Sequence, residues 1–263
     1  MTITAPNIIL LTGFSDSLNE YVNRLDTPPS AARAVIIRAL IDSMKNHGGW
    51  YILDDLHLYA AENEDQGHTN LVNPDYPKSV VVDAPTFTAN NGFQMDGVND
   101  AINSRFIFPI YRKNLQLNSA CSFLWTRTAG TSNIADSGGI TGGNTVLLTC
   151  RTGSNTITGR ICDGTSDAST ATHTDAATLI MINRPTDSIK QYFRSGVQLG
   201  ADIARASTSV PASVSLSYYY GANQAGTFGT RQIAAGGLGG GHTPTQALNL
   251  YNSLATYMTA VGA

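Results

Sequence analysis

The chain has 263 residues, of which 42% are hydrophobic and only 13% are charged. That length provides for one large domain, or for one domain with an appendage, and it can bury a core without disulfides or metal. The net charge of −3, with the basic residues scattered along the chain, excludes an electrostatic footprint for nucleic acid or for an anionic membrane surface.

The cysteines and the N-terminal segment bear on the compartment in which the chain folds. Cys121, Cys150 and Cys162 are odd in number and irregularly spaced, which predicts free thiols and folding in a reducing compartment. The apolar run at residues 8–11 has no basic residue before it and is too short for a signal peptide or a membrane span. We therefore expect neither an ordinary export signal nor membrane insertion.

Residues 1–65 are expected to form a helical docking region. Helical spacing of apolar residues predicts a first helix over 17–25. The Pro28-Pro29 breaker, followed by Ser30 as an N-cap, predicts a second helix that runs to residue 47, and a third is expected over 51–62. The second helix carries an apolar stripe at spacings of three and four residues, formed by Ala34, Ile37, Ile41 and Met44.

From about residue 80 the pattern changes to short runs of Val, Ile, Thr, Phe and Tyr separated by Gly, Asn, Asp and Ser. Such runs are typical of strands and tight turns. Strands are expected over residues 79–82, 92–95, 101–108, 120–128, 145–150, 156–162, 179–183, 188–194, 197–199, 214–220 and 232–235. The clearest hairpin has Pro185 in its loop, where a type I turn favours it.

The C-terminal part of the chain returns to helix. The glycine-rich stretch 236–241 lacks the Lys-Ser/Thr of a phosphate loop and is interpreted as a flexible approach to that helix. Thr243-Pro244-Thr245-Gln246 has the pattern of a capping box and begins a helix over 243–261. Together the elements predict a mainly β protein: an antiparallel β-sandwich of the jelly-roll type over 66–263, closed by the C-terminal helix and preceded by a helical N-terminal appendage.

Three stretches resemble a known superfamily. Residues 85–102, with Asp96-Gly97-Val98-Asn99-Asp100, resemble the strand–turn–strand opening of concanavalin A-like and laminin-G-like lectin domains. Residues 180–199 resemble the hairpin of the same domains, and 233–251 resemble their closing strand and helix. Upstream, residues 49–61 and 70–74 are similar to bacteriophage proteins that carry such a domain. The resemblance covers about residues 30–260 and implies a structural protein of a bacteriophage or phage-like particle.

The carboxylates do not form the pattern of an enzyme. Glycosidases built on this sandwich need two facing carboxylates. The chain has three glutamates, all before residue 66, and the aspartates after them stand mostly beside turn-forming residues. No Gly-x-Ser-x-Gly elbow occurs. We therefore expect no catalytic residues and no enzymatic activity.

Two kinds of binding site are still open to a lectin-like sandwich. Aromatic rings that would stack on sugars are Trp125, Tyr218 and Tyr220. Alternation sends Tyr219 to the opposite face, so at least one tyrosine of this run faces outward, whereas Phe123 two residues earlier favours burial of Trp125. No cofactor is expected, apart from a candidate Ca²⁺ site in turns at the rim of the sandwich. The candidate ligands are Asp96, Asn99 and Asp100, or Asp163 and Asp167. All five are residues that turns favour, so a structural role is expected of them first.

The resemblance implies a virion structural protein of the tail, fibre or head surface, whose lectin-like domain contacts host glycans. Its partners would be other virion proteins and host cell-surface glycans, but no nucleic acid. It would be an oligomer within the particle, located in the virion after assembly in the host cytoplasm. Two alternatives stay open: a non-viral carbohydrate-binding or glycoside hydrolase-like module, and an assembly protein whose lectin fold has no ligand.

Overall fold

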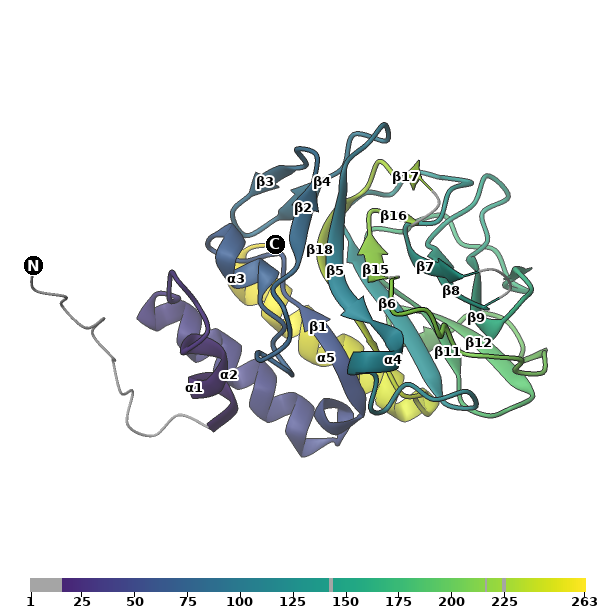
Figure 1. Ribbon diagram of the computed structural model, residues 1–263, viewed down its shortest axis with the longest axis horizontal. Helices are drawn as coiled ribbons and strands as arrows, with labels where there is room; N and C mark the ends of the chain where they lie inside the picture. The colour runs from purple at the N-terminus through teal and green to yellow at the C-terminus, as the bar shows by residue number, and fades with distance from the viewer. Residues whose placement is uncertain (1–15, 142–143, 216, 224–225) are drawn as a thin grey trace, which may run out of the picture.

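A computed structural model describes residues 16–141, 144–215, 217–223 and 226–263. The apolar run at residues 8–11 lies outside the described residues. Two antiparallel sheets stack face to face, and helices cover one of them (Figure 1). The expected mainly β fold class, an antiparallel β-sandwich with N-terminal helices and a C-terminal helix, is confirmed.

Sheet A has nine strands in the order β13-β12-β11-β6-β18-β4-β3, with β1 paired to β18 and β14 paired to β12. The strands are β1 (Leu53–His57), β3 (Thr86–Thr88), β4 (Gly92–Gln94), β6 (Ala120–Thr126), β11 (Leu179–Arg184), β12 (Ile189–Arg194), β13 (Val197–Gln198), β14 (Ile203–Ala204) and β18 (Gln232–Gly239). The predicted hairpin is the β11–β12 pair, in register from Ile180↔Arg194 to Asn183↔Gln191.

Sheet B has seven strands in the order β10-β9-β8-β7-β15-β5-β2. They are β2 (Val80–Val82), β5 (Ala101–Ile107), β7 (Ser137–Thr141), β8 (Asn144–Thr149), β9 (Thr158–Asp163), β10 (Asp167–Ala168) and β15 (Ser217–Tyr220). A separate two-stranded ribbon consists of β16 (Ala222–Asn223) and β17 (Thr227–Phe228).

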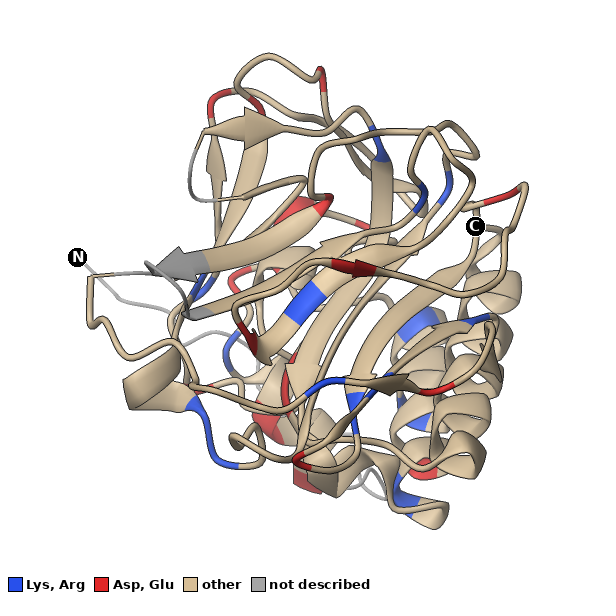
Figure 2. Cartoon of the chain, turned by 90° about the vertical axis from the view of Figure 1, so that its right-hand side faces the viewer, with Lys and Arg blue, Asp and Glu red and all other residues tan. Residues whose placement is uncertain are grey.

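The long helices α2 (Ala31–Asn46) and α5 (Pro244–Val261) pack against each other along one side of the sandwich (Figure 2), and α1 (Asp16–Val22) lies beside α2 (Figure 1). Ser30 caps α2 as predicted, since its Oγ accepts from the Arg33 backbone N–H, and Thr243 and Gln246 form the predicted capping box of α5. Shorter helical turns are η1 (Gly49–Ile52), α3 (Glu64–His68) and α4 (Phe108–Tyr111). Among the described residues no helix has the length and apolar character to cross a membrane.

The hydrophobic core has two layers. Between the sheets lie inward-facing residues such as Phe93, Leu124 and Ile180. Between sheet A and the helices lies a second layer, in which Phe123 and Met181 of the sheet share a cluster with helix residues. The four residues of the predicted α2 stripe are all buried in that second layer: Ala34, Ile37, Ile41 and Met44. The three helices therefore cover the outer face of sheet A and leave the outer face of sheet B to solvent.

Two sequence predictions are wrong. Residues 51–62 were expected to be helical, but they contain the end of η1 and the strand β1. The glycine-rich stretch 236–241 was expected to be a flexible approach, but most of it belongs to β18, which pairs with both β1 and β6. Both errors have one cause, because β1 approaches β18 so closely that side chains do not fit between them.

Gly237 and Gly239 show this close approach. A Cβ at Gly237 would lie 2.6 Å from the Asp55 carbonyl oxygen and 2.4 Å from the Phe123 ring. A Cβ at Gly239 would lie 2.3 Å from the Ile52 carbonyl oxygen. Because these glycines have no side chain, the backbone of β1 can approach β18 closely, and the segment is an ordered strand rather than a flexible one.

The three cysteines are free, as predicted, and all three are fully buried. Burial raises the pKa of the Cys121, Cys150 and Cys162 thiols. The thiols therefore act as small apolar side chains of the core.

Candidate functional site

Two of the predicted glycan-binding residues cannot bind a glycan. Tyr218 and Tyr220 are 0% exposed and lie between the two sheets. The Tyr218 hydroxyl lies 2.6 Å from Ser122 Oγ and 2.7 Å from Ser137 Oγ, and the Tyr220 hydroxyl donates to Asp55 Oδ2 at 2.5 Å. The prediction for these two residues is wrong, because the face of β15 that carries them is the core face.

Trp125, the third predicted residue, lies on the face of sheet A that the helices cover. It is partly exposed, and its ring stacks on that of Tyr251 of α5 with 5.7 Å between centroids and 4° between planes. One face of the indole is therefore occupied by protein. A role of Trp125 in glycan binding stays a prediction.

The predicted calcium ligands mainly hold a turn together. Asp96 Oδ1 accepts from the backbone N–H groups of Val98, Asn99 and Asp100 at 2.8, 3.2 and 3.2 Å, and the first of these bonds does most to lower the pKa of Asp96. The Asp100 carboxylate accepts from the Ala84 N–H. Within the described ranges no group of three or more His, Cys, Asp or Glu is arranged to hold a metal ion. Calcium binding at Asp96, Asn99 and Asp100 stays a prediction.

The second pair of candidate ligands is occupied by cationic side chains. Asp163 Oδ2 lies 2.6 Å from Arg184 Nη2 and 3.2 Å from Lys190 Nζ. Asp167 lies 2.7 Å from Lys190 Nζ and 2.8 Å from Arg205 Nη2. These contacts form an ion network that is buried at Asp163, Arg184 and Lys190 and partly exposed at Asp167 and Arg205. Both carboxylates are therefore already paired with cationic side chains.

The outer face of sheet B carries one continuous row of aligned residues. The register places Asn103 of β5 beside Tyr219 of β15, then Gly138 of β7, Leu147 of β8 and Arg160 of β9. Since neighbouring strands lie about 4.8 Å apart, the row from Tyr219 to Arg160 spans about 14 Å. The row is long enough to bind an extended ligand across the strands.

The middle of the row is apolar and its ends are polar. A Cβ at Gly138 would lie 2.2 Å from Leu147 Cδ2, so the Leu147 side chain lies over Gly138, the residue that pairs with Tyr219. At one end the Asn103 amide donates to the Tyr219 hydroxyl at 3.1 Å. At the other end Arg160 Nε donates to Ser166 Oγ at 2.8 Å. An apolar platform with hydrogen-bonding groups at both ends is suited to a sugar chain, which has apolar ring faces and polar edges.

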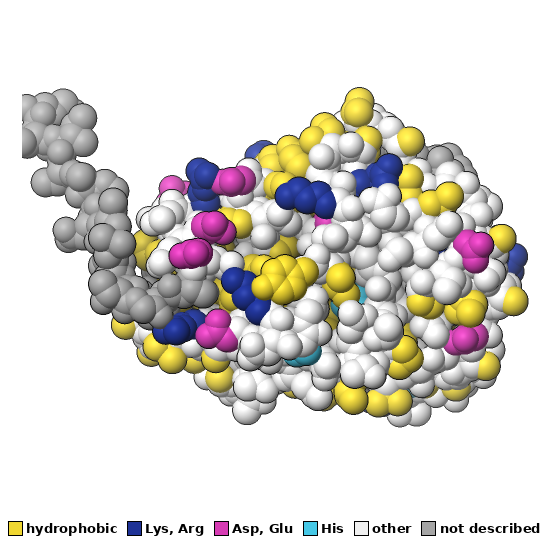
Figure 3. Space-filling model, turned by 90° about the horizontal axis from the view of Figure 1, so that it is seen from below, with side chains coloured by type: hydrophobic (Ala, Val, Ile, Leu, Met, Phe, Trp, Pro, Cys, Tyr) yellow, Lys and Arg dark blue, Asp and Glu magenta, His cyan; other side chains and the backbone are white. Residues whose placement is uncertain are grey.

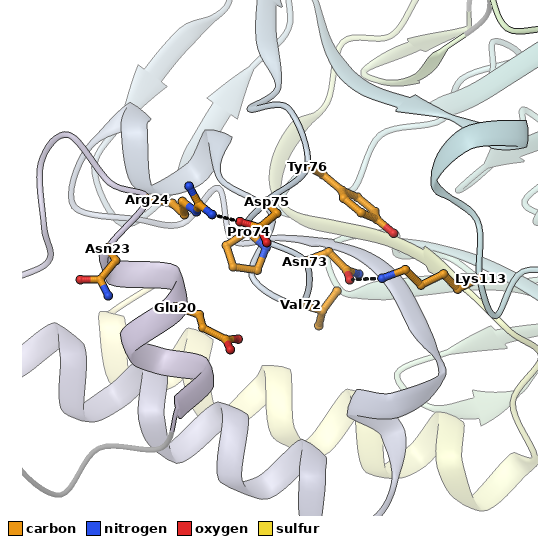
Figure 4. A pocket seen from close by; sticks show the side chains of 9 residues that line it. All are labelled: Glu20, Asn23, Arg24, Val72, Asn73, Pro74, Asp75, Tyr76 and Lys113. Atoms are coloured by element: carbon orange, nitrogen blue, oxygen red, sulfur yellow. Dashed lines mark hydrogen bonds and ion pairs between the residues drawn. The ribbon is translucent and has the colours of Figure 1, made fainter.

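A separate pocket of about 390 Å³ opens at the end of the molecule where α1 meets the loop before β2 (Figure 4). Its lining comes from three segments that are far apart in the sequence: Glu20 of α1 with Asn23 and Arg24 of the turn that follows it, residues 72–76, and Lys113. Arg24 forms an ion pair with Asp75, and Lys113 Nζ donates to Asn73 Oδ1 at 3.1 Å. Apart from Val72, Pro74 and Tyr76, the lining is polar.

Two histidines are paired with an acidic or hydroxyl side chain, as in catalytic sites, but these pairs are largely buried. His57 Nε2 lies 3.2 Å from Asp55 Oδ1, yet the two side chains are 0% and 2% exposed. His68 Nδ1 lies 2.8 Å from Ser79 Oγ, and Ser79 is buried. Burial lowers the pKa of His68 to about 4. The Asp55–His57 pair is therefore closed to a substrate, and in the second pair only His68 is partly exposed, since Ser79 is buried.

Sequence reasoning found the faces of these strands but not the sites. Alternation in the Tyr218–Tyr220 run already placed Tyr219 opposite its neighbours. No local pattern links Tyr219 with Asn103 or Arg160, which reach the same row only through the pairing of the strands. The pocket likewise has no local signal, because it is built from three distant segments.

An antiparallel β-sandwich with one sheet covered by helices and the other open is thus the class of protein that the geometry defines. No family model and no curated protein matches the chain. Similar solved structures include domain 4 of AbnA, an extracellular GH43 arabinanase from Geobacillus stearothermophilus in complex with arabinotriose. The match has 12% identity and a TM-score of 0.51, and covers 76% of this chain and 98% of that one.

Two further matches are to larger proteins. A sialidase from Trypanosoma rangeli matches with 10% identity and a TM-score of 0.54, over 85% of this chain and 39% of that one. A point mutant of HCR/D matches with 12% identity and a TM-score of 0.53, over 77% of this chain and 52% of that one. At such identities the likeness shows the fold alone, and this chain spans about half or less of these two proteins.

Proposed function

We propose that the chain is a non-catalytic carbohydrate-binding module that binds a glycan along the outer face of sheet B. One observation carries the proposal: α1, α2 and α5 cover sheet A, whereas the other sheet presents the Tyr219 row to solvent. Tyr219, Asn103 and Arg160 are each partly exposed there. A lectin needs an aromatic or apolar platform with hydrogen-bond donors around it, and this row has both.

The residues of the Tyr219 row are also the reason why we propose a module without catalytic activity. Hydrolysis of a glycosidic bond needs two carboxylates on either side of the scissile bond. Neither Tyr219 nor its aligned partners Asn103, Gly138, Leu147 and Arg160 supplies a carboxylate. Domain 4 of the arabinanase was solved with arabinotriose, which supports a carbohydrate as the first ligand to try.

Replacing Tyr219 with alanine is expected to weaken glycan binding at least about tenfold, because a central aromatic contact contributes ~1.4 kcal/mol or more. The measurement is isothermal titration calorimetry with arabinotriose and with the best ligand from a glycan array. The matched control is Tyr51→Ala, since Tyr51 is an exposed tyrosine of η1 outside this row. Equal affinities of the Tyr219 variant and the wild type would place the glycan elsewhere, and no binding on the array would remove the proposal.

A virion structural role is the second candidate. The observation that favours it is the similarity of residues 49–61 and 70–74 to bacteriophage proteins with a lectin-like domain. In that case the chain would be an oligomer in the particle, would contact other virion proteins, and would present sheet B to host glycans. Mass spectrometry of purified particles tests this role directly, and absence of the chain from them would contradict it.

A further inference from the structure

The pocket at α1 has a floor that is fixed before any ligand arrives. The Asn73 amide donates to the Asp54 carbonyl oxygen at 2.7 Å, and the Asn73 backbone N–H donates to Asn70 Oδ1 at 3.1 Å. The Asn70 side chain is buried and is itself held by Asp55 at 2.9 Å. A pinned floor lowers the ordering cost of binding a small ligand.

The aromatic wall of the pocket is fixed in the same way. The Tyr76 hydroxyl donates to the Tyr111 carbonyl oxygen at 2.7 Å, and the two rings lie 4.6 Å apart. Lys113 Nζ lies 5.4 Å from the centre of the Tyr76 ring. Burial raises the pKa of Tyr76 to about 12, so its hydroxyl keeps its proton and its bond at neutral pH.

The charges that line the pocket cancel. Glu20 and Asp75 supply two negative charges, and Arg24 and Lys113 supply two positive ones. On the face shown in Figure 3, basic and acidic side chains are likewise interspersed and most of the surface is uncharged. An anion or a cation therefore gains little from the field of the pocket, whereas a neutral ligand with several hydroxyls can donate to the carboxylates and accept from the cations and amides.

Two polar groups of the pocket are still unused. Within the part of the chain that the structure describes, neither the Glu20 carboxylate nor the Asn23 side-chain amide has a hydrogen bond or ion pair with another side chain. Both residues are exposed, Glu20 on α1 and Asn23 in the turn just after it, across the pocket from Lys113 (Figure 4). A ligand seated between α1 and the fixed floor would give both groups a partner.

We infer that this pocket is a second binding site, specific for a small neutral polyhydroxylated ligand such as a mono- or disaccharide. The site shares no residue with the Tyr219 row and does not depend on it. Its volume of about 390 Å³ lies within the usual range of small-molecule sites. Glu20 and Asn23 bind hydroxyls from the helix side, and Lys113 and Asn73 bind them from the loop side.

The test uses the full chain labelled with ¹⁵N and titrated with D-galactose, D-glucose and L-arabinose, with D-galacturonate as the charged comparator. We expect the side-chain amide signals of Asn23 and Asn73 to shift with at least one neutral sugar, and galacturonate to bind more weakly than D-galactose. The double variant Glu20→Ala/Asn23→Ala removes only unpaired groups and should fold normally. It is expected to weaken binding about tenfold or more.

Two control variants separate this site from the open face of sheet B. Asp16→Ala lies on the same helix outside the pocket and should bind as the wild type does. Tyr219→Ala should also keep its affinity for the small sugar, even though it loses the longer glycan. Unmoved Asn23 and Asn73 signals, tighter binding of galacturonate, or wild-type affinity of the double variant would each overturn the inference.

Discussion

The Asp163→Asn variant is expected to lose about 3 to 5 kcal/mol of its free energy of unfolding, as is typical when one partner of a buried ion pair is removed. Arg184 and Lys190 both have side chains that are 0% exposed, and Asp163 is the carboxylate that they share. Asparagine keeps the shape of the side chain but removes its charge. Two buried cations then have only the partly buried Asp167 to balance them.

Urea denaturation at neutral pH measures this loss. Asp187→Asn is the matched control, because Asp187 is exposed in the loop of the same hairpin and should change stability by no more than about 0.5 kcal/mol. A loss below 1 kcal/mol for Asp163→Asn would show that water already solvates the two cations. The variant also bears on function, since Asp163 and Arg160 lie on the same strand, β9. We expect glycan binding to weaken together with stability.

Local signals in the sequence predicted most of the elements. The Ser30 cap, the capping box at Thr243 and the α2 stripe depend on neighbours within four residues, so they can be predicted without the fold. The β11–β12 hairpin was predictable for the same reason, since its turn and its two apolar runs are adjacent. The sequence patterns of these helices and of this hairpin are local, which is why they can be predicted without knowledge of the fold.

Two of the elements that sequence reasoning missed, β1 and β7, pair with segments far along the chain. β1 is a strand because β18 offers it a glycine-lined edge, and the residues of β18 that pair with β1 lie 179 or more residues further along the chain. Strand β7, with Gly138 and Gly139, also lacks the apolar alternation on which the strand predictions relied. In both β18 and β7 glycine allows close packing in the folded sheet, whereas glycine in a sequence is more typical of turns and flexible segments.

Only part of the candidate site on the outer face of sheet B, the Tyr219 row, could be predicted from the sequence. Alternation showed that Tyr219 and its two neighbours face opposite ways, but the sequence does not say which face is core. The core face is set by the second sheet, which packs on Tyr218 and Tyr220. The helices that cover sheet A then decide which sheet can bind, and that arrangement is a property of the whole fold.

Lowering the pH from 7 to 4 is expected to destabilise the protein by several kcal/mol, chiefly through His68 and His242. Burial lowers the pKa of both imidazoles to about 4, against 6.5 for an ordinary histidine. The folded protein therefore binds fewer protons than the unfolded chain between pH 6.5 and pH 4. Their contribution is fully present above pH 6.5 and is lost as the pH falls through that window, by about 3 kcal/mol for each histidine at most.

The His242→Asn variant isolates one of these two contributions. His242 is 0% exposed, its Nδ1 lies 3.1 Å from the Gly240 carbonyl oxygen, and its Nε2 has no partner among the described residues. Protonation would therefore place an unpaired charge in the core, whereas the asparagine amide can keep the bond to Gly240 and has no proton to gain. Free energies of unfolding from urea titrations at pH 7, 6, 5 and 4 should fall less steeply for the variant than for the wild type.

Two carboxyl groups have the opposite effect on the pH dependence of stability. Because of them, the contribution of His242 can be measured only by comparing the variant with the wild type. Desolvation raises the pKa of Asp54 and Asp136, so these groups add stability at low pH that is lost as the pH rises. They partly offset the histidines in the wild type, but they are the same in the variant and cancel in the comparison. Parallel pH profiles of the two proteins would show that His242 takes up its proton in the folded state without cost, which requires the β18–α5 junction to open to water.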